Sequence, residues 1–303
     1  MKLTIPSCII ALTGALALYS ATALATPISV VDDTGQTVTL KAPAQRIVTL
    51  APSAVEIVYA AGAGAKIVGT VEYSDYPPAA TQIPRVGGYS KLDIEAIVAS
   101  KPDLVLAWES GNSPSAIEKI RQLGIPVYMS QPNQITDVAT NIDRVGILAG
   151  THTTAKKAAQ DFNQRYAALN KTFAKRDPVR MFYQISPNPL ITIGGHQIIT
   201  DAIRTCGGVN IFADLKPMAP RVSYESVIAE NPEAIITSGM YEIRPELLDA
   251  WKKWPNLTAT QRNNFFFIQS DLINRAGPRI LDGTKILCDA LQSTRDHRKK
   301  TTP

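Results

Sequence analysis

Glu95-Ala-Ile-Val-Ala-Ser-Lys-Pro-Asp-Leu-Val-Leu106 recurs later in the chain, without a gap, as Glu225-Ser-Val-Ile-Ala-Glu-Asn-Pro-Glu-Ala-Ile-Ile236. Asp93 and Ser223 precede the two glutamates by two positions, and both are favoured N-cap residues. Each copy therefore predicts an exposed acid in a first helical turn, a short helix, a loop broken by proline and a buried strand. Two copies are too few for a solenoid. The sequence predicts two similar α/β lobes, each of which presents one glutamate at an equivalent place.

The pattern around the two copies indicates alternating strands and helices. Helical patterns separate the apolar runs, which favours a mostly parallel sheet in each lobe. The predicted strands are residues 46–50, 66–70, 104–108, 126–129, 179–185, 190–193 and 265–268. The predicted helices of the second half are residues 197–206, 245–252 and 278–291.

Residues 153–175 differ in kind, because apolar residues recur there at helical spacing and polar residues fill the other face. A helix of this length measures about 35 Å, roughly the width of a domain. We therefore predict an N-terminal α/β lobe over residues 26–151, a rigid connecting helix over 152–177 and a C-terminal α/β lobe over 178–303. The basic tail of the last lobe, residues 295–300, is expected to be solvated.

The first 25 residues have the features of a secretory signal peptide. Lys2 gives the positive start, residues 8–18 form the apolar run, and Ala23-Leu24-Ala25 is a typical cleavage site. We expect cleavage after Ala25 and an exported protein. Two cysteines remain after cleavage, Cys206 and Cys288. Export favours a disulfide between them, and two buried free thiols are the alternative.

The sequence lacks the patterns of the common enzyme, metal and nucleic-acid classes. It has no nucleophile elbow, zinc-binding helix motif or phosphate-binding loop. Its three histidines have no metal-ligand spacing, and its net charge of +5 is not arranged as a basic face interleaved with aromatics. We therefore expect a monomer that is not an enzyme and has no resident cofactor, metal site or nucleic-acid partner.

Aromatic residues follow predicted strands, at the sheet edge where ligands of open α/β sheets bind. Trp108 ends one strand, Tyr73 follows another, and Tyr89 lies in the loop before the first repeat. Such rings suit a flat and largely apolar ligand, although they could instead cap the core. Asp271 and Arg275 follow a strand of the second half, and Arg279 lies one turn further on. These three residues would clamp polar groups of a ligand or pair with each other.

Several further segments carry a resemblance to a known family. They are Tyr73-Ser-Asp-Tyr-Pro-Pro78, Ile97-Val-Ala-Ser-Lys-Pro-Asp-Leu-Val-Leu-Ala-Trp108 with Gly111-Asn112, Cys206-Gly-Gly with Asn210-Ile-Phe, Val222-Ser-Tyr-Glu225, Ser270-Asp271 and Arg275-Ala-Gly-Pro-Arg-Ile280. Through them the chain resembles the cobalamin-binding periplasmic proteins, the vitamin B12 receptors of ABC importers. The resemblance covers nearly all of residues 26–303. The repeated segment alone is shared with ferric-siderophore and heme receptors of the same fold.

The resemblance implies a periplasmic protein that holds cobalamin between two lobes, with little lobe movement, and delivers it to an importer. It places Tyr73, Tyr89 and Trp108 on the corrin ring, and Asp271 and Arg275 on corrin side groups. These five residues are the predicted ligand-binding set.

The resemblance also implies a Cys206–Cys288 disulfide, and docking of Glu95 and Glu225 onto arginines of the membrane permease. A carboxylate in a first helical turn is favoured by the helix dipole in any case. Two such acids at equivalent points of two lobes additionally suit a two-fold symmetric partner that presents arginines.

The chain departs from the family pattern at three places. Ile185 and Ala219 stand where close relatives tend to have aromatics, and Tyr89 stands where a tryptophan is usual. The thinner ring of aromatics favours weaker binding or a different corrinoid. A second hypothesis is delivery of heme or a ferric siderophore, for which Arg221, Arg275 and His196 would serve as ligand contacts.

Overall fold

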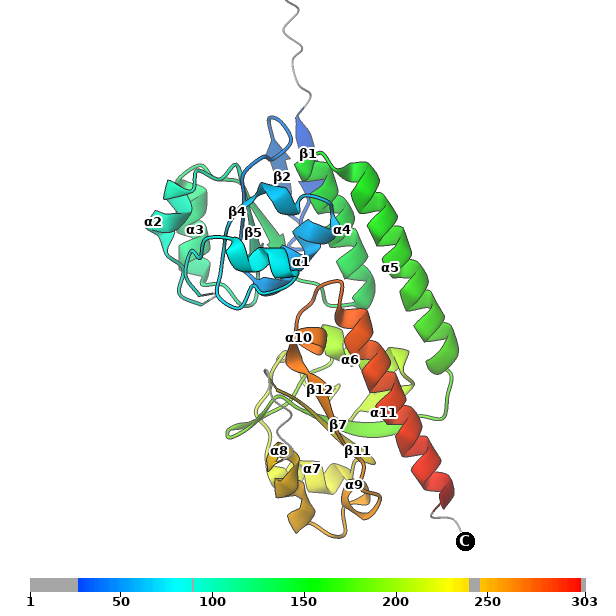
Figure 1. The fold of residues 1–303 in the computed structure, drawn as a ribbon. Coiled ribbons are helices and arrows are strands. Elements are labelled where there is room, and N and C mark those ends of the chain that lie inside the picture. The colour runs from blue at the N-terminus through cyan, green and yellow to red at the C-terminus, as the bar shows by residue number, and fades with distance from the viewer. Residues whose placement is uncertain (1–26, 89, 240–245, 301–303) are drawn as a thin grey trace, which may run out of the picture.

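The computed structural model describes residues 27–88, 90–239 and 246–300, and it confirms the predicted fold class of two α/β lobes joined by one long helix (Figure 1). The N-terminal sheet has the order β4-β3-β5-β6, and the C-terminal sheet has the order β10-β7-β11-β12. All neighbouring strands within these two sheets are parallel. The strands are β3 Ile47–Thr49, β4 Ile67–Thr70, β5 Leu104–Trp108, β6 Val127–Ser130, β7 Val179–Gln184, β10 Gly208–Asn210, β11 Ala234–Gly239 and β12 Phe265–Gln269.

The repeated segment forms equivalent elements in the two lobes. In the first copy the Asp93 carboxylate accepts a hydrogen bond from the Ala96 backbone N–H at 2.9 Å, which caps α2 (Ile94–Ala99), and β5 follows. In the second copy the Ser223 hydroxyl accepts from the Ser226 N–H at 3.1 Å, which caps α7 (Tyr224–Glu230), and β11 follows. The predicted order of cap, short helix and strand is confirmed in both copies.

Two antiparallel helices, α4 (Ile135–Ala149) and α5 (His152–Phe173), pack side by side. Helix α4 ends at Gly150, which adopts φ +70°, and α5 turns back along it (Figure 1). The helices approach closely at Gly146, where an added Cβ would lie 2.1 Å from the Ala155 Cβ. The connecting helix was predicted, but its partner α4 was not singled out. The largest hydrophobic core lies along these helices and continues from β3 into β7.

Helix α11 (Ile280–Lys300) corrects the prediction of a solvated basic tail. The helix continues to Lys300 instead of ending near residue 291. Arg295 is only 5% exposed, and its guanidinium donates to the backbone oxygens of Asp177, Cys206 and Gly207. Arg298 forms an ion pair with Glu233 at 2.6 Å. The charges that looked like a tail therefore hold the last helix against its own lobe.

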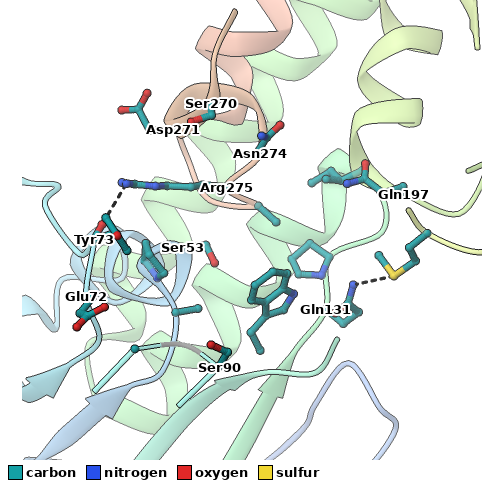
Figure 2. Close-up of a pocket in the computed structure, with 18 of the residues that line it drawn as sticks. Ser53, Glu72, Tyr73, Ser90, Gln131, Gln197, Ser270, Asp271, Asn274 and Arg275 are labelled. Carbon is teal, nitrogen blue, oxygen red and sulfur yellow. Dashed lines mark hydrogen bonds between the residues drawn. The ribbon is translucent and has the colours of Figure 1, made fainter. Parts of the chain in front are cut away.

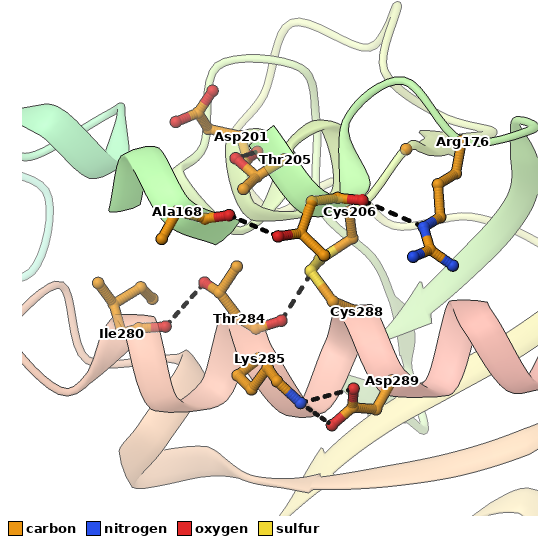
Figure 3. The surroundings of a disulfide bond; sticks show 12 residues. Ala168, Arg176, Asp201, Thr205, Cys206, Ile280, Thr284, Lys285, Cys288 and Asp289 are labelled. Atoms are coloured by element: carbon orange, nitrogen blue, oxygen red, sulfur yellow. Dashed lines mark hydrogen bonds and ion pairs between the residues drawn. A yellow bond between two sulfur atoms is a disulfide. The ribbon is translucent and has the colours of Figure 1, made fainter. Parts of the chain in front are cut away.

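The Cys206–Cys288 disulfide is present, and it joins the end of α6 (Ile198–Thr205) to the middle of α11 (Figure 3). Both cysteines are buried, and they are separated by 82 positions. The bond therefore ties the last helix to the C-terminal lobe, in the same region as the Arg295 contacts.

The remaining elements complete the two lobes. The helices and 3-10 turns are α1 Pro52–Ala60, η1 Gly64–Lys66, η2 Pro78–Gln82, α3 Pro114–Gln122, α8 Glu246–Asp249, η3 Ala250–Lys253, α9 Thr258–Gln261 and α10 Ser270–Ile273. The short hairpins are β1 Ile28–Val31 with β2 Thr37–Leu40, and β8 Ser186–Pro187 with β9 Leu190–Ile191. In the part of the chain that the structure describes, no helix combines the length and apolar character needed to cross a bilayer.

Candidate ligand-binding cleft between the lobes

A cavity of about 700 Å³ lies between the lobes, beyond the carboxyl ends of the strands. The N-terminal lobe contributes an aromatic and proline-rich wall, and the C-terminal lobe contributes a wall of mainly polar side chains (Figure 2). The N-terminal wall is lined by Ala51, Pro52, Ser53, Glu72, Tyr73, Gly88, Ser90, Trp108, Gln131 and Pro132. The opposite wall is lined by Gln197, Ile198, Met218, Gln269, Ser270, Asp271, Asn274, Arg275 and Ala276.

Trp108 is held at the end of β5 by the turn that follows it. Its backbone N–H donates to the Asn112 side-chain oxygen at 2.7 Å, and the buried Asn112 amide donates to the Leu50 carbonyl at 2.9 Å. The indole lies against Gly111, where an added Cβ would be 1.9 Å from the ring. Only glycine leaves room for the ring in this orientation, so the turn fixes the largest aromatic surface of the cleft.

Tyr73 lies at the same edge of the N-terminal sheet, in the turn after β4. Its backbone has φ 63°, a left-handed conformation that is uncommon for a residue with a side chain. Tyr73 is 48% exposed, and it lines the cleft. Its ring is therefore open to contact from the cavity, which Trp108 also lines.

The two arginines that follow α10 are engaged with the N-terminal lobe. Arg275 Nη1 lies 2.7 Å from Asp75 Oδ1, and its Nη2 donates to the Tyr73 carbonyl at 3.0 Å. Arg279 binds both carboxylate oxygens of Glu56, at 3.1 and 2.7 Å. Of the three residues for which mutual pairing was one expectation, Asp271 does pair with Arg279, at 2.9 Å, whereas Arg275 pairs with Asp75 of the other lobe.

Burial and charge oppose each other at Glu56. Burial raises the pKa of the Glu56 carboxyl, and the hydrogen bond and charge of Arg279 oppose this without cancelling it. On the other side of the pair, burial disfavours the Arg279 cation, but its bonds to Glu56 and Asp271 leave its pKa raised. The arginine also lies over the Tyr76 ring, 4.0 Å from the centroid.

The structure does not place every residue named from the sequence in the cleft. Tyr89 lies outside the described residues. His196, Arg221, Ile185 and Ala219 are described, and none of them is among the residues that line the cavity. Among the described residues, no group of three or more histidine, cysteine or carboxylate side chains is placed to hold a metal ion.

Several lining residues were not found from the sequence. Gln131 and Met218 meet across the cleft, with the Gln131 amide nitrogen 3.8 Å from the Met218 sulfur (Figure 2). Gln197 is the N-cap of α6, and the Asn274 side-chain oxygen accepts a hydrogen bond from the Tyr183 hydroxyl at 2.9 Å. These residues lie in irregular loops or at helix ends, where no periodic pattern marks them.

Glu95 and Glu225 occupy equivalent positions, one in the first turn of α2 and the other in the first turn of α7. Both are exposed. The pKa of Glu225 is lowered by backbone N–H donation and by the Ser223 hydroxyl, so its negative charge is favoured. The structure therefore presents these two solvent-facing carboxylates at equivalent places of the two lobes.

The chain belongs to the periplasmic binding protein family, whose model matches residues 47–272. Within that family it is 40% identical over 250 residues to a vitamin B12-binding protein of Vibrio cholerae, covering 82% of this chain and 90% of that protein. It is 35% identical to a vitamin B12-binding protein of Yersinia pestis, over 82% and 87% of the two chains. The family resemblance predicted from the sequence is confirmed.

Solved structures give the same result for the fold. The crystal structure of the periplasmic vitamin B12-binding protein BtuF of Vibrio cholerae matches with a TM-score of 0.77 at 39% identity, covering 84% of this chain and 98% of that one. The periplasmic heme-binding protein RhuT of Roseiflexus matches with a TM-score of 0.72 at 23% identity, over 82% and 99%. The second likeness bears on the fold alone.

Proposed function

We propose that this protein captures cobalamin between its two lobes in the periplasm and delivers it to an ABC importer. The cleft carries this proposal, because it sets the rings of Trp108 and Tyr73 against a wall of polar, mostly uncharged side chains. A corrin is a broad ring system whose edge carries amide groups. Its face suits the aromatic wall, and its amides suit glutamine, asparagine and serine side chains.

The charges of the cleft favour this ligand over a carboxylate-bearing one. The charged side chains among the described lining residues are Glu72, Asp271 and Arg275. Arg275 already lies 2.7 Å from Asp75, so its charge is matched within the protein. Heme propionates or an anionic siderophore would meet more negative than positive charge there. Heme or a ferric siderophore nevertheless remains the second candidate, since heme-binding proteins share the fold.

Delivery requires contact with a membrane permease, and we assign that contact to Glu95 and Glu225. Both carboxylates are exposed in first helical turns of equivalent helices. Arginine recognises a carboxylate through two parallel hydrogen bonds, so one arginine on each half of a two-fold permease fits the pair. The proposed role requires binding and release but no reaction, and we assign it to a monomer that takes no part in nucleic-acid binding.

The proposed location follows from the family and from the first 25 residues. These residues lie outside the described part of the chain, and cleavage after Ala25 stays a prediction. N-terminal sequencing of the exported protein tests it, with Thr26 as the expected first residue.

Calorimetric titration of residues 26–303 with cyanocobalamin, and in parallel with heme, tests the proposed ligand. We expect saturable one-to-one binding of cyanocobalamin that is submicromolar and much tighter than binding of heme. Tighter binding of heme, or no heat from cyanocobalamin with a protein whose circular dichroism shows it to be folded, would overturn the proposal.

A further inference from the structure

Five charged side chains form one continuous network between the lobes, which we call the interlobe network. Glu56 and Asp75 belong to the N-terminal lobe, and Asp271, Arg275 and Arg279 belong to the C-terminal lobe. Glu56 is the centre, because Arg279 Nη2 lies 2.7 Å and Arg275 Nη1 lies 3.6 Å from its Oε1 atom. Its side chain is only 2% exposed, so these two guanidiniums replace the water that the carboxylate has lost.

The network lies directly behind one end of the cleft. Arg275 and Asp271 line the cavity, and Figure 2 shows Arg275 extended toward Tyr73 on the opposite wall. The loop between the two arginines closes around Glu56, since a Cβ added at Gly277 would lie 3.3 Å from Glu56 Oε2. The position of this loop relative to α1 therefore also sets the distance between the two walls.

The other end of the cleft carries a second contact between the lobes. The Asp201 carboxylate on α6 accepts a hydrogen bond from the Ile135 backbone N–H at the start of α4, at 2.9 Å. Asp201 lies one helical turn beyond Gln197, which lines that end of the cavity. With the interlobe network at one end and this bond at the other, both ends of the cleft are fixed.

We propose that Glu56 is a positioning residue that fixes the spacing of the two cleft walls before any ligand arrives. Separation of the lobes at this end would break the two-bond contact of Arg279 with Glu56 together with the Arg275 bonds to Asp75 and Tyr73, and these charge-assisted bonds oppose it. Glu56 thus holds Asp271 and Arg275 opposite Tyr73 and Trp108 without lining the cavity itself. The inference rests on the proposed function only in taking the cleft as the binding site.

The inference is tested by distances between spin labels in the ligand-free protein. Gln122→Cys on α3 and Gln261→Cys on α9 place exposed labels on the two lobes of the disulfide-bonded chain, residues 26–303. We expect a narrow distance distribution for the parent protein. Glu56→Gln keeps the size of the side chain but removes its charge, and we expect it to broaden or shift the distribution.

Glu233→Gln is the matched control. Glu233 also binds two arginines, Arg298 at 2.6 Å and Arg262 at 3.3 Å, but all three lie in the C-terminal lobe. We expect this variant to lower the midpoint of thermal unfolding and to leave the distance distribution unchanged. An equal change in the distribution for both variants would mean that lost stability alone is responsible, and would overturn the inference.

Ligand binding gives the second readout. If Glu56→Gln leaves one tenth of the molecules with correctly spaced walls, the cyanocobalamin affinity falls about tenfold, and the ligand narrows the distribution again. Arg279→Lys keeps the cation but loses the two-bond contact, and we expect the same direction of change if Glu56→Gln does not fold. An unchanged distribution in the folded variant, whichever of the two it is, contradicts the inference. Because the distances are measured without ligand, they test the role of Glu56 even if cobalamin proves to be the wrong ligand.

Discussion

At the residue scale, the orientation of Trp108 depends on a glycine three positions later in the chain. A Cβ at position 111 would lie 1.9 Å from the indole, which is impossible without movement of the ring. We expect Gly111→Ala to turn Trp108 away from its place in the cleft and to lower the cyanocobalamin affinity about tenfold or more. Calorimetry measures the affinity, and the tryptophan emission maximum reports the new environment of the ring.

Gly35→Ala serves as the control for this glycine substitution. Gly35 lies in the turn between β1 and β2 with φ +82°, and a Cβ there meets nothing within 4 Å. Alanine in this left-handed conformation costs about 1 kcal/mol of folding free energy. The control variant should therefore lose stability and keep the parent affinity. An unaltered affinity in Gly111→Ala would show that the indole position does not matter for binding.

Residues of the cleft differ in how far the sequence reveals them. Tyr73 and Trp108 were predicted to lie there because Tyr73 follows one strand and Trp108 ends another, and parallel strands end at one edge of a sheet. The partners of Arg275 were not predicted, because Asp75 lies 200 positions away and only the docking of the two lobes brings them together. Gln131, Gln197 and Met218 were missed since irregular loops have no periodicity.

At the scale of the element, the last helix is held by Glu233 and its arginines. Burial acts to raise the pKa of Glu233, but the hydrogen bonds and charge of Arg298, the Arg180 backbone N–H and the charge of Arg262 together outweigh it, so the pKa lies below the ordinary value of 4.5. A lowered pKa means that the stabilisation is present above about pH 4.5 and is lost as the pH falls through the pKa of the folded protein. Glu233→Gln should therefore cost about 2 kcal/mol at pH 7 and much less at pH 3.

Urea unfolding of the parent and of Glu233→Gln at the two pH values measures this difference. A stability difference that grew at the lower pH would contradict the assignment, since the protonated glutamic acid and glutamine are both uncharged.

The Cys206–Cys288 disulfide also holds α11 against the C-terminal lobe. It closes a loop of 82 positions and so lowers the conformational entropy of the unfolded chain. In the chain-entropy model this stabilises the folded state by about 4–5 kcal/mol. We expect Cys206→Ala combined with Cys288→Ala to lower the free energy of unfolding by about this amount. The affinity for cyanocobalamin at low temperature should change little, since neither cysteine lines the cavity. Equal stability with and without the bond would contradict this account.

Elements were predicted where one local signal decides them. The two short helices follow from their cap residues, and α5 follows from its apolar spacing. Helix α4 was missed, although it is amphipathic, because its role depends on packing against α5 through Gly146. The end of α11 was misread because charged residues usually mark a solvated end, whereas Arg295 here bonds to carbonyl oxygens inside the lobe.

At the scale of the whole molecule, binding and docking are assigned to separate surfaces. Glu95 and Glu225 lie outside the cavity, on α2 and α7. We expect Glu95→Ala with Glu225→Ala to abolish cobalamin uptake by cells or by proteoliposomes that contain the importer. The calorimetric affinity for cyanocobalamin should not change.

Asp161→Ala with Asp289→Ala is the matched control for docking. These two exposed carboxylates lie on α5 and α11, where each pairs with a lysine one turn away. Their removal changes the net charge by the same amount and should leave transport intact. A loss of ligand affinity in the Glu95 and Glu225 variant, equal to its loss of transport, would contradict the docking assignment.

The affinity of residues 26–303 for cyanocobalamin, measured for the parent and for Trp108→Ala in one calorimetric series, tests the central claim most directly. The account predicts one-to-one submicromolar binding by the parent, and a loss of about 2 kcal/mol or more when the largest ring of the cleft is removed. No binding by the folded parent, or the same affinity in both proteins, would contradict capture of cobalamin between the lobes.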